Sequence, residues 1–165
     1  MIAQKKHRLE QMASTSRLWI FQSSKKISGE LFSHISERLD SFLSSWAAHG
    51  SELFSGFDIR HDRFIIIAVD EALAPATGCS IDGMMAVIQE LDQSYNLDLL
   101  NRMKVAYRQG DEVRESDMNS FREMLVNGSA NAETKVFNNI LGTLGQMEGE
   151  WEVPVSKSWH ANLLS

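Results

Sequence analysis

The sequence predicts an α+β fold of the ferredoxin-like kind, with a βαββαβ order, an antiparallel sheet and additional C-terminal helices. An apolar run rich in β-branched residues at 64–69 is the clearest buried-strand pattern in the chain. Two long segments, one before and one after this run, repeat apolar residues at helical spacing. Read in chain order, the elements are strand, helix, strand, strand, helix and strand.

The first strand is expected at residues 18–21, a short apolar run that ends before Gln22. Ser28 is a suitable N-cap for the first helix, and Glu30 places a negative charge in its first turn. The buried face of this helix is expected to consist of Leu31, Ile35, Leu39, Phe42 and Trp46. The pair at 49–50 is expected to end it, because glycine tolerates the positive φ common just past a helix.

Residues 54–60 and 64–70 are expected to form a hairpin that turns at 61–62. The second helix is expected to be capped by Ser80, with Asp82 in its first turn. Its buried face is expected to contain Met84, Met85, Val87, Ile88 and Leu91, and Asn96 is expected to close it.

Alternation of apolar and polar residues at 103–108 predicts a fourth strand, placed at a sheet edge. Two C-terminal helices are expected after it, the first capped by Ser116 and the second by Thr134. Apolar residues recur at helical spacing in the second of these, at Phe137, Ile140, Leu141, Leu144 and Trp151. Gly142 and Gly145 are expected to weaken that helix by about 1 kcal/mol each relative to alanine.

Residues 1–16 are polar and weakly patterned, so they are expected to form a flexible N-terminal extension. Residues 17–165 are expected to form a single α+β domain, because this length suits one core. A second possible fold is a mixed sheet to which residues 153–155 add a fifth strand.

Composition narrows the class of protein. The net charge of −6 argues against a dedicated nucleic-acid binder, which usually carries a basic face. One cysteine cannot form an internal disulfide, and no apolar run approaches the roughly 20 residues of a membrane helix. The basic N-terminus is not followed by the apolar stretch of a signal peptide. These observations predict a cytoplasmic protein without a nucleic-acid or membrane partner.

The predicted topology suggests one end of the sheet as a candidate site. In a fully antiparallel sheet, the end of the first helix and the loop before the second lie at the same end, which brings His49 near Cys79. Cys79 is expected just before a helix start, where the dipole and free N–H groups stabilise a thiolate or another anion. The candidate ligand-binding residues are Asp70, Glu71, Thr77, Gly78, Cys79, Ser80 and Asp82.

Each of these residues also has a plainer interpretation. A lone cysteine at a helix start is more often a small packed residue than a nucleophile. The five histidines show no ligand spacing, so neither a metal site nor a cofactor is expected. A group of basic residues, expected at the opposite end of the sheet, is more typical of a solvated turn than of a phosphate clamp; it comprises Lys25, Lys26, Arg60, His61 and Arg63. The asparagines at 138–139 need hydrogen-bond partners if they are buried.

Several stretches resemble an uncharacterised family of small proteins from Bacteroidetes-type bacteria. The resemblance extends from about Leu9 to His160, and the stretches that carry it are residues 17–22, 46–50, 64–71, 76–82, 136–139, 151–154 and 158–160. Members of that family are often labelled ABC transporter ATPases. This chain has no Gly-Lys pair and therefore no P-loop, so the resemblance implies no ATPase activity.

Three functions remain open on the sequence. The first is a non-catalytic binding or interaction domain with a small-ligand or anion pocket near Cys79. The second is a thiol-dependent enzyme with Cys79 as nucleophile and His49 as base. The third is an assembly module that forms a homodimer through the edge of strand 54–60 or strand 103–108.

Overall fold

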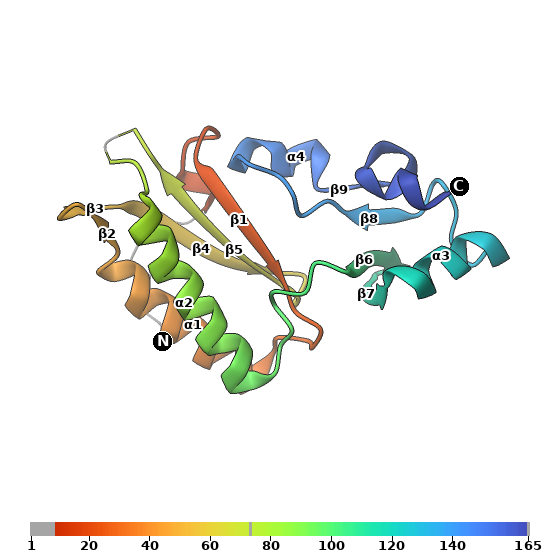
Figure 1. Cartoon of the computed structure of the whole chain (residues 1–165), viewed down its shortest axis with the longest axis horizontal. Helices are drawn as coiled ribbons and strands as arrows, with labels where there is room; N and C mark the ends of the chain where they lie inside the picture. The colour runs from red at the N-terminus through yellow and green to blue at the C-terminus, as the bar shows by residue number, and fades with distance from the viewer. Residues whose placement is uncertain (1–8, 73, 165) are drawn as a thin grey trace. The chain divides into compact units, whose positions relative to one another are not determined.

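The computed structural model describes residues 9–72 and 74–164 (Figure 1). It is a mixed α+β structure in which the paired strands are antiparallel, so the predicted class is confirmed. The chain divides into two compact units. The first holds the residues up to Leu100 together with Gly142–Gly145, and the second holds Asn101–Leu141 and the residues from Gln146 onward. That residues 17–165 act as one domain stays a prediction.

The predicted flexible extension lies partly outside the described residues, which begin at Leu9. From there the chain forms a short 3₁₀ helix, η1 (Leu9–Gln11), in which Leu9 is buried. Met12 after it is buried as well, and its amide donates to the Leu9 carbonyl. This part of the predicted extension therefore belongs to the packed structure of the first unit.

The sheet of the first unit contains β1 (Arg17–Gln22), β4 (Phe54–Arg60) and β5 (Phe64–Asp70) in the order β1-β5-β4. The predicted first and third strands are therefore neighbours, and the predicted hairpin joins β4 to β5. Because β5 lies between two strands, its main-chain groups are paired on both sides. Every residue of its apolar run, 64–69, is fully buried, as the continuous β-branched pattern predicts.

Two helices, α1 (Gly29–Ser44) and α2 (Gly78–Tyr95), lie side by side on one face of this sheet (Figure 1). Their buried residues pack with alternate residues of the strands into one core. Members of this core include Phe21, Ile35, Leu39, Leu43, Ile65, Ile67, Val69, Met84, Ile88 and Leu91. Ser28 occupies the N-cap position of α1, and Asn96 closes α2 in the left-handed conformation (φ 55°), as predicted.

The predicted end of the first helix is wrong. Helix α1 ends at Ser44, and the chain then forms a small hairpin of β2 (Ala47–Ala48) and β3 (Ser51–Glu52). His49 (φ 52°) and Gly50 (φ 79°) are its two turn residues. Two successive residues with positive φ are typical of a tight hairpin. A glycine with positive φ also ends many helices, so the sequence pattern did not separate the two.

The predicted fourth strand is not part of this sheet. Strand β6 (Lys104–Gln109) lies in a second antiparallel sheet of order β7-β6-β8-β9, with β7 (Glu112–Asp117), β8 (Lys135–Phe137) and β9 (Glu152–Pro154). The strand order therefore does not confirm the ferredoxin-like arrangement, and β6 is an internal strand rather than an edge.

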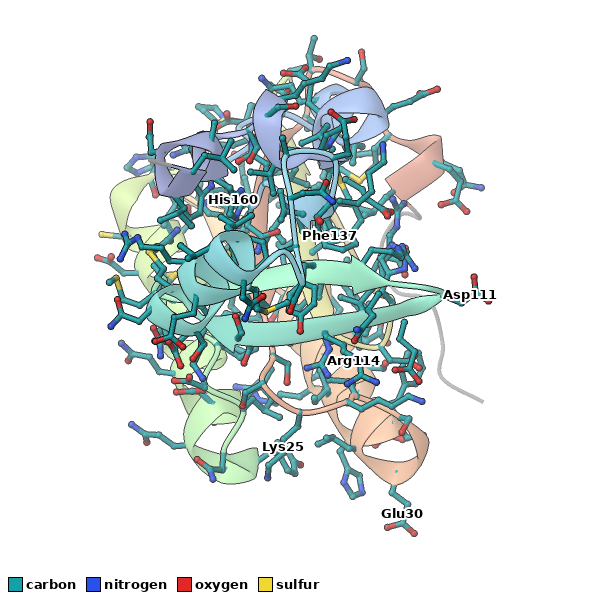
Figure 2. All side chains as sticks on the ribbon, turned by 90° about the vertical axis from the view of Figure 1, so that its right-hand side faces the viewer. Lys25, Glu30, Asp111, Arg114, Phe137 and His160 are labelled. Carbon is teal, nitrogen blue, oxygen red and sulfur yellow. The ribbon has the colours of Figure 1, made fainter. Side chains whose placement is uncertain are left out.

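Strand β7, which the sequence analysis missed, is the reason for this difference. It consists of charged and polar residues apart from Val113 and carries no apolar run, but Gly110 (φ 62°) allows a tight turn that folds it back onto β6. Figure 2 shows Asp111 at the tip of this hairpin and Arg114 on β7. On the other side, β6 pairs with β8 through Tyr107 and Val136.

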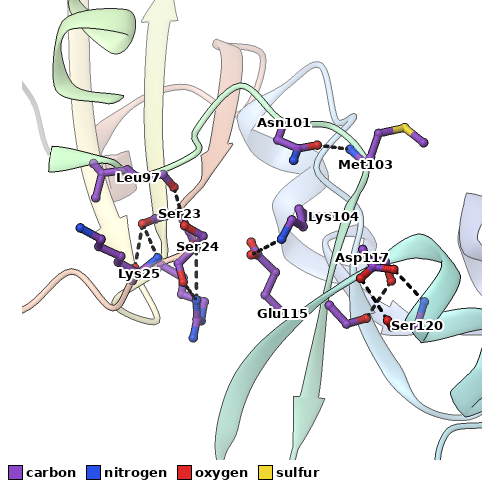
Figure 3. A network of polar contacts seen from close by, with 12 residues as sticks. Ser23, Ser24, Lys25, Leu97, Asn101, Met103, Lys104, Glu115, Asp117 and Ser120 are labelled. Atoms are coloured by element: carbon purple, nitrogen blue, oxygen red, sulfur yellow. Dashed lines mark hydrogen bonds and ion pairs between the residues drawn. The ribbon is translucent and has the colours of Figure 1, made fainter. Parts of the chain in front are cut away.

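Helix α3 (Met118–Asn127) follows β7 directly and ends at Gly128 (φ 84°), as predicted. Its N-cap is Asp117 rather than Ser116. The Asp117 carboxylate accepts hydrogen bonds from the amide (2.8 Å) and the hydroxyl (3.0 Å) of Ser120 (Figure 3). The core of the second unit comprises Val105, Tyr107, Phe121, Ala130, Val136, Val155 and Leu163.

The second predicted C-terminal helix does not form. Its residues instead supply β8, a short 3₁₀ helix, η2 (Leu144–Gln146), and the four-residue segment α4 (Met147–Glu150), which is kinked because Glu148 and Gly149 have non-helical backbone angles. Strand β9 follows at the position of the predicted fifth strand, but in the second sheet. After it come two 3₁₀ helices, η3 (Val155–Lys157) and η4 (Trp159–Leu164). The apolar spacing was misleading because it crosses two glycines, each of which weakens a helix.

Those glycines belong to a segment that pairs with the outer edge of β1 at the start of this strand. We call Gly142–Gly145 the strap. Its Thr143 forms an antiparallel bridge with Arg17. The Leu18 amide donates to the Gly142 carbonyl (3.1 Å), and the Leu144 amide donates to the Ser16 carbonyl (2.8 Å). The strap thus occupies the edge of β1 where a ferredoxin-like sheet would place its fourth strand.

Within the described residues, no helix combines the length and the apolar character needed to cross a membrane.

Replacing Gly145 tests how tightly the strap is seated. A Cβ at this position would lie 2.9 Å from Ser14 Cβ and 3.1 Å from the Ser14 carbonyl oxygen. Gly145→Ala is therefore expected to lower the free energy of unfolding by about 1–3 kcal/mol, measured by urea denaturation. Gly83→Ala is the control. Gly83 lies in the interior of α2, and a Cβ there would lie 4.0 Å from the nearest atom, which belongs to the Phe42 ring. It is expected to be neutral or stabilising, and equal losses for both variants would contradict the prediction.

His160 predicts a pH dependence for the second unit. The residue is almost completely buried, and burial lowers its pKa from 6.5 to about 4, because the charged ring is poorly solvated there. The unfolded chain therefore binds this proton at a higher pH than the folded chain. Stability from neutral His160 is fully present above pH 6.5 and is lost as the pH falls toward 4.

The loss between pH 7 and pH 5 is expected to reach about 2 kcal/mol, measured as the free energy of unfolding in urea. His160→Gln removes the titrating group and is expected to flatten this part of the stability profile. If the variant and the unaltered protein lose stability equally between these pH values, His160 is not the source.

Candidate functional site

The start of α2 is closed by a reciprocal pair of hydroxyl residues. Thr77 is the N-cap, and its Oγ1 accepts a hydrogen bond from the Ser80 amide (3.2 Å). The Ser80 Oγ in turn accepts from the Thr77 amide (2.7 Å), which completes a capping box. The prediction that Ser80 is the cap is therefore wrong by three residues, and Asp82 lies in the second turn rather than the first. Two hydroxyls spaced for a capping box give the sequence two equivalent N-cap candidates.

Cys79 is accordingly the second residue of the helix, and its side chain is exposed. Gly78, the first residue, is exposed as well. The main-chain amides of these two residues have no acceptor among the residues that the structure describes. Both amides belong to the positive end of an 18-residue helix. The helix therefore presents two free N–H donors beside the thiol.

The two acidic candidates hold the preceding loop together. Asp70 Oδ1 accepts a hydrogen bond from the Ala72 amide (3.0 Å). Glu71 Oε2 accepts from the Ala76 amide (2.8 Å) and lies 3.9 Å from the Arg17 guanidinium. These contacts bring the chain from the end of β5 to the N-cap of α2. Both carboxylates thus have a structural role beside any ligand-binding role that the sequence suggested.

His49 lies at the exposed tip of the β2–β3 hairpin. The indole N–H of Trp46, at the base of this hairpin, donates to the Ser80 carbonyl (2.8 Å). This contact joins the chain just before the hairpin to the first turn of α2. It supports the expectation that His49 and Cys79 lie at the same end of the first unit. Within the described residues, however, no hydrogen bond joins the Cys79 thiol to His49.

An aromatic group beside α2 was not recognised from the sequence as part of this end. The Trp46 ring packs edge-on against Trp19 (6.3 Å between centroids) and at a tilt against Phe42 (5.3 Å). The Arg17 guanidinium lies 4.9 Å from the centre of the Trp19 ring, a cation–π contact. Trp19 and Phe42 are half-buried. The available signal was the aromatic and apolar stretch 17–22, which was interpreted only as a strand.

The basic group at 25–26 and 60–63 lies near the other end of α2, as predicted. The Ser23 amide donates to the Arg63 carbonyl (2.7 Å), which joins the β1–α1 loop to the hairpin. Lys25 Nζ donates to the Tyr95 carbonyl (2.8 Å) in the last turn of α2. The Ser24 amide donates to the Leu97 carbonyl (2.8 Å), and Figure 3 shows these two residues side by side.

The cations of this group mostly serve the fold. Arg63 Nη1 donates to the carbonyls of Ser23 and Ser24, both at 3.2 Å. Arg60 pairs with Asp58 at 2.8 Å. His61 and Asp62, both with φ 53°, form the predicted turn. Lys25 and Arg63 therefore donate to carbonyl groups, and Arg60 neutralises a carboxylate.

The asparagine pair also has a structural explanation. Asn139 Oδ1 accepts a hydrogen bond from the Trp151 indole (2.9 Å), and the Asn138 amide donates to the Trp151 carbonyl (2.7 Å). These bonds hold the chain after β8 against the turn before β9. The partners that the sequence analysis required are therefore present.

Among residues 9–72 and 74–164, no three side chains of His, Cys, Asp or Glu gather in a group that could hold a metal ion. No protein-family model, no curated protein and no solved structure matches this chain.

Trp46→Phe tests the contact that joins the two segments of the candidate site. The variant keeps an aromatic ring but leaves the Ser80 carbonyl without its indole donor, so it is expected to cost about 1–3 kcal/mol of unfolding free energy. Trp19→Phe is the matched control, because the Trp19 side chain has no hydrogen bond within the described part of the chain. If Trp19→Phe proves as costly, ring volume and not the hydrogen bond determines the effect.

Proposed function

We propose that this chain is a non-catalytic cytoplasmic binding domain that takes a small anionic ligand at the start of α2. The observation that carries the proposal is the pair of unpaired amides at Gly78 and Cys79, which lie in the exposed first turn of a long helix. Main-chain N–H groups at such a position are suitable donors to phosphate or carboxylate oxygens.

The chemistry of the cap supports an anion at this position. The Thr77–Ser80 capping box satisfies the amides of both its residues with neutral hydroxyls, and the Glu71 carboxylate accepts from the Ala76 amide before the cap rather than from the first turn. Asp82, which the sequence placed in the first turn, lies one turn farther along, where its charge opposes a bound anion less. The helix dipole adds about 0.3–1 kcal/mol for a negative charge at its N-terminus.

A binding role accounts for the geometry better than a thiol-dependent enzyme does. Such an enzyme needs a base close to the sulfur to activate the nucleophile. His49 is at the tip of a separate hairpin and makes no hydrogen bond to Cys79. Asp70 and Glu71, the carboxylates of the loop before α2, already accept hydrogen bonds from loop amides.

Titration of the ¹⁵N-labelled protein with inorganic phosphate tests the proposal by NMR. The amide signals of Gly78 and Cys79 are expected to shift progressively at constant ionic strength. Helix α3 is the internal control, because hydrogen bonds from the amide and then the hydroxyl of Ser120 lower the pKa of its cap, Asp117, and keep that carboxylate charged. Phosphate is expected to leave the first amides of α3 unchanged.

Two variants of the cap make this experiment sharper. Thr77→Asp keeps a capping oxygen but adds a charge beside the free amides, and it is expected to weaken phosphate binding roughly tenfold or more. Thr77→Ser keeps both the cap and its neutrality, so it is expected to bind phosphate as the unaltered protein does. Equal shifts in all three proteins, or no shift at Gly78 and Cys79, would refute the anion site.

The same titration, with Mg-ATP as the ligand, tests what the family resemblance implies. We propose that the chain belongs with the uncharacterised bacterial family that it resembles and that it does not bind nucleotide as an ATPase. The sequence has no P-loop to hold phosphates and magnesium. Mg-ATP is therefore expected to shift the Gly78 and Cys79 amides no more than phosphate does and without dependence on magnesium.

A second candidate function is assembly through a sheet edge. Strand β4 is paired with β5 on one side, and no strand among the described residues pairs with its other side, which leaves an edge of the kind that pairs with a second copy. The other strand considered for this role, at 103–108, is excluded as an edge because β6 lies between β7 and β8. For the fold, we propose that the first unit is a ferredoxin-like arrangement in which the strap replaces the fourth strand.

A further inference from the structure

The strap belongs to the first unit, whereas the residues directly before and after it belong to the second. The chain leaves the second unit after Leu141, runs along β1 and returns to the second unit at Gln146. A segment of this kind completes one packed unit while its flanking chain belongs to another. This is the connectivity of an element that two copies of a protein can exchange.

The contacts that seat the strap are largely contacts of the main chain. The amides of Leu144 and Gly145 donate to the carbonyls of Ser16 and Ser14, both at 2.8 Å. The Leu18 amide donates to the Gly142 carbonyl (3.1 Å) on the other side of the bridged pair. Main-chain pairing at a strand edge is made equally well by the same segment of another chain.

The seat is also shaped for this segment. A Cβ added at Gly145 would lie only 2.9 Å from the Ser14 Cβ, so there is no room for a side chain at this position. A second copy supplies the same glycine at the same position, whereas an unrelated extended peptide with a side chain there would clash. The geometry therefore favours the strap of another copy of this chain over other partners.

We propose that the strap is exchangeable, so that two copies of this chain form a dimer in which each strap pairs with β1 of the other copy. In one chain at low concentration, the intramolecular contact is favoured by its high effective concentration. Exchange becomes competitive when the strap is released, as during refolding, and when the protein is concentrated.

A designed disulfide reports which β1 each strap occupies. Arg17 and Thr143 face each other in the antiparallel bridge, and the two hydrogen bonds of the neighbouring residues flank them. Such non-hydrogen-bonded pairs bring the two Cα atoms to about 4.5 Å, within the range of a disulfide. The test protein is Arg17→Cys/Thr143→Cys with Cys79→Ser, which removes the native thiol.

The protein is refolded at a series of concentrations, oxidised and separated on non-reducing gels. Equal amounts of two copies that differ in isotope label are mixed before refolding, and mass spectrometry of the dimer identifies peptides that join residue 17 of one copy to residue 143 of the other. The expected result is an intramolecular link in dilute samples. At low conversion, the dimer fraction is expected to rise about tenfold for each tenfold increase in concentration.

Two controls make the result interpretable. The pair Gln109→Cys/Glu112→Cys, also with Cys79→Ser, lies across the tight β6–β7 turn and is expected to link within one chain at every concentration. Adding Gly145→Ala to the test protein is expected to raise the unlinked fraction and to leave the ratio of dimer to intramolecular link unchanged, because the clash with Ser14 weakens the strap equally in its own seat and in that of another copy.

Three outcomes would overturn the proposal. The first is a 17–143 link that stays within one chain at all concentrations. The second is the absence of any link, which would mean that the strap is not seated on β1. The third is a dimer that lacks the 17–143 link between copies, which would indicate pairing through β4 instead.

Discussion

The first unit depends on the need to pair every main-chain group of a buried strand. Strand β5 is apolar and buried on both faces from Phe64 to Val69, so water cannot satisfy its amides and carbonyls there. It requires a partner on each side, and β1 and β4 supply them. The main-chain groups on the outer edges of β1 and β4 then need hydrogen-bond partners in turn. The strap pairs with the start of β1, and no strand within the described residues pairs with the outer edge of β4.

The position of β5 also determines where the candidate site lies. Where β5 ends at Asp70, the chain leaves the sheet and turns through a loop before α2 begins. The Asp70 and Glu71 carboxylates hold this loop. The helix then starts beside Trp46, whose indole N–H satisfies the Ser80 carbonyl. The exposed amides of Gly78 and Cys79 are therefore fixed by the same chain of contacts that pairs the central strand. The proposed anion site follows from the architecture rather than from a set of catalytic side chains.

Elements whose sequence pattern reflects burial were predicted correctly, whereas turns and helix caps, which depend on one or two residues, were misplaced. The continuous run of β5 and the stripes of α1 and α2 were predicted because a buried face requires apolar residues at a fixed period. The positions of His49 and Ser80 were misjudged because glycines and hydroxyl residues suit several neighbouring positions. The charged strand β7 was missed because it contains only one apolar residue, so the sequence shows no apolar pattern there.

The sequence by itself determined the α+β class, the central strand, the two long helices and the absence of a P-loop. Each follows from residues close together in the chain. Only the tertiary structure decided that β6 joins a second sheet, that the strap pairs with the start of β1 and that Trp46 contacts Ser80. These contacts join residues far apart in sequence. Main-chain hydrogen bonds mediate most of them, and any residue but proline can make such bonds, so they leave almost no trace in the identity of the side chains.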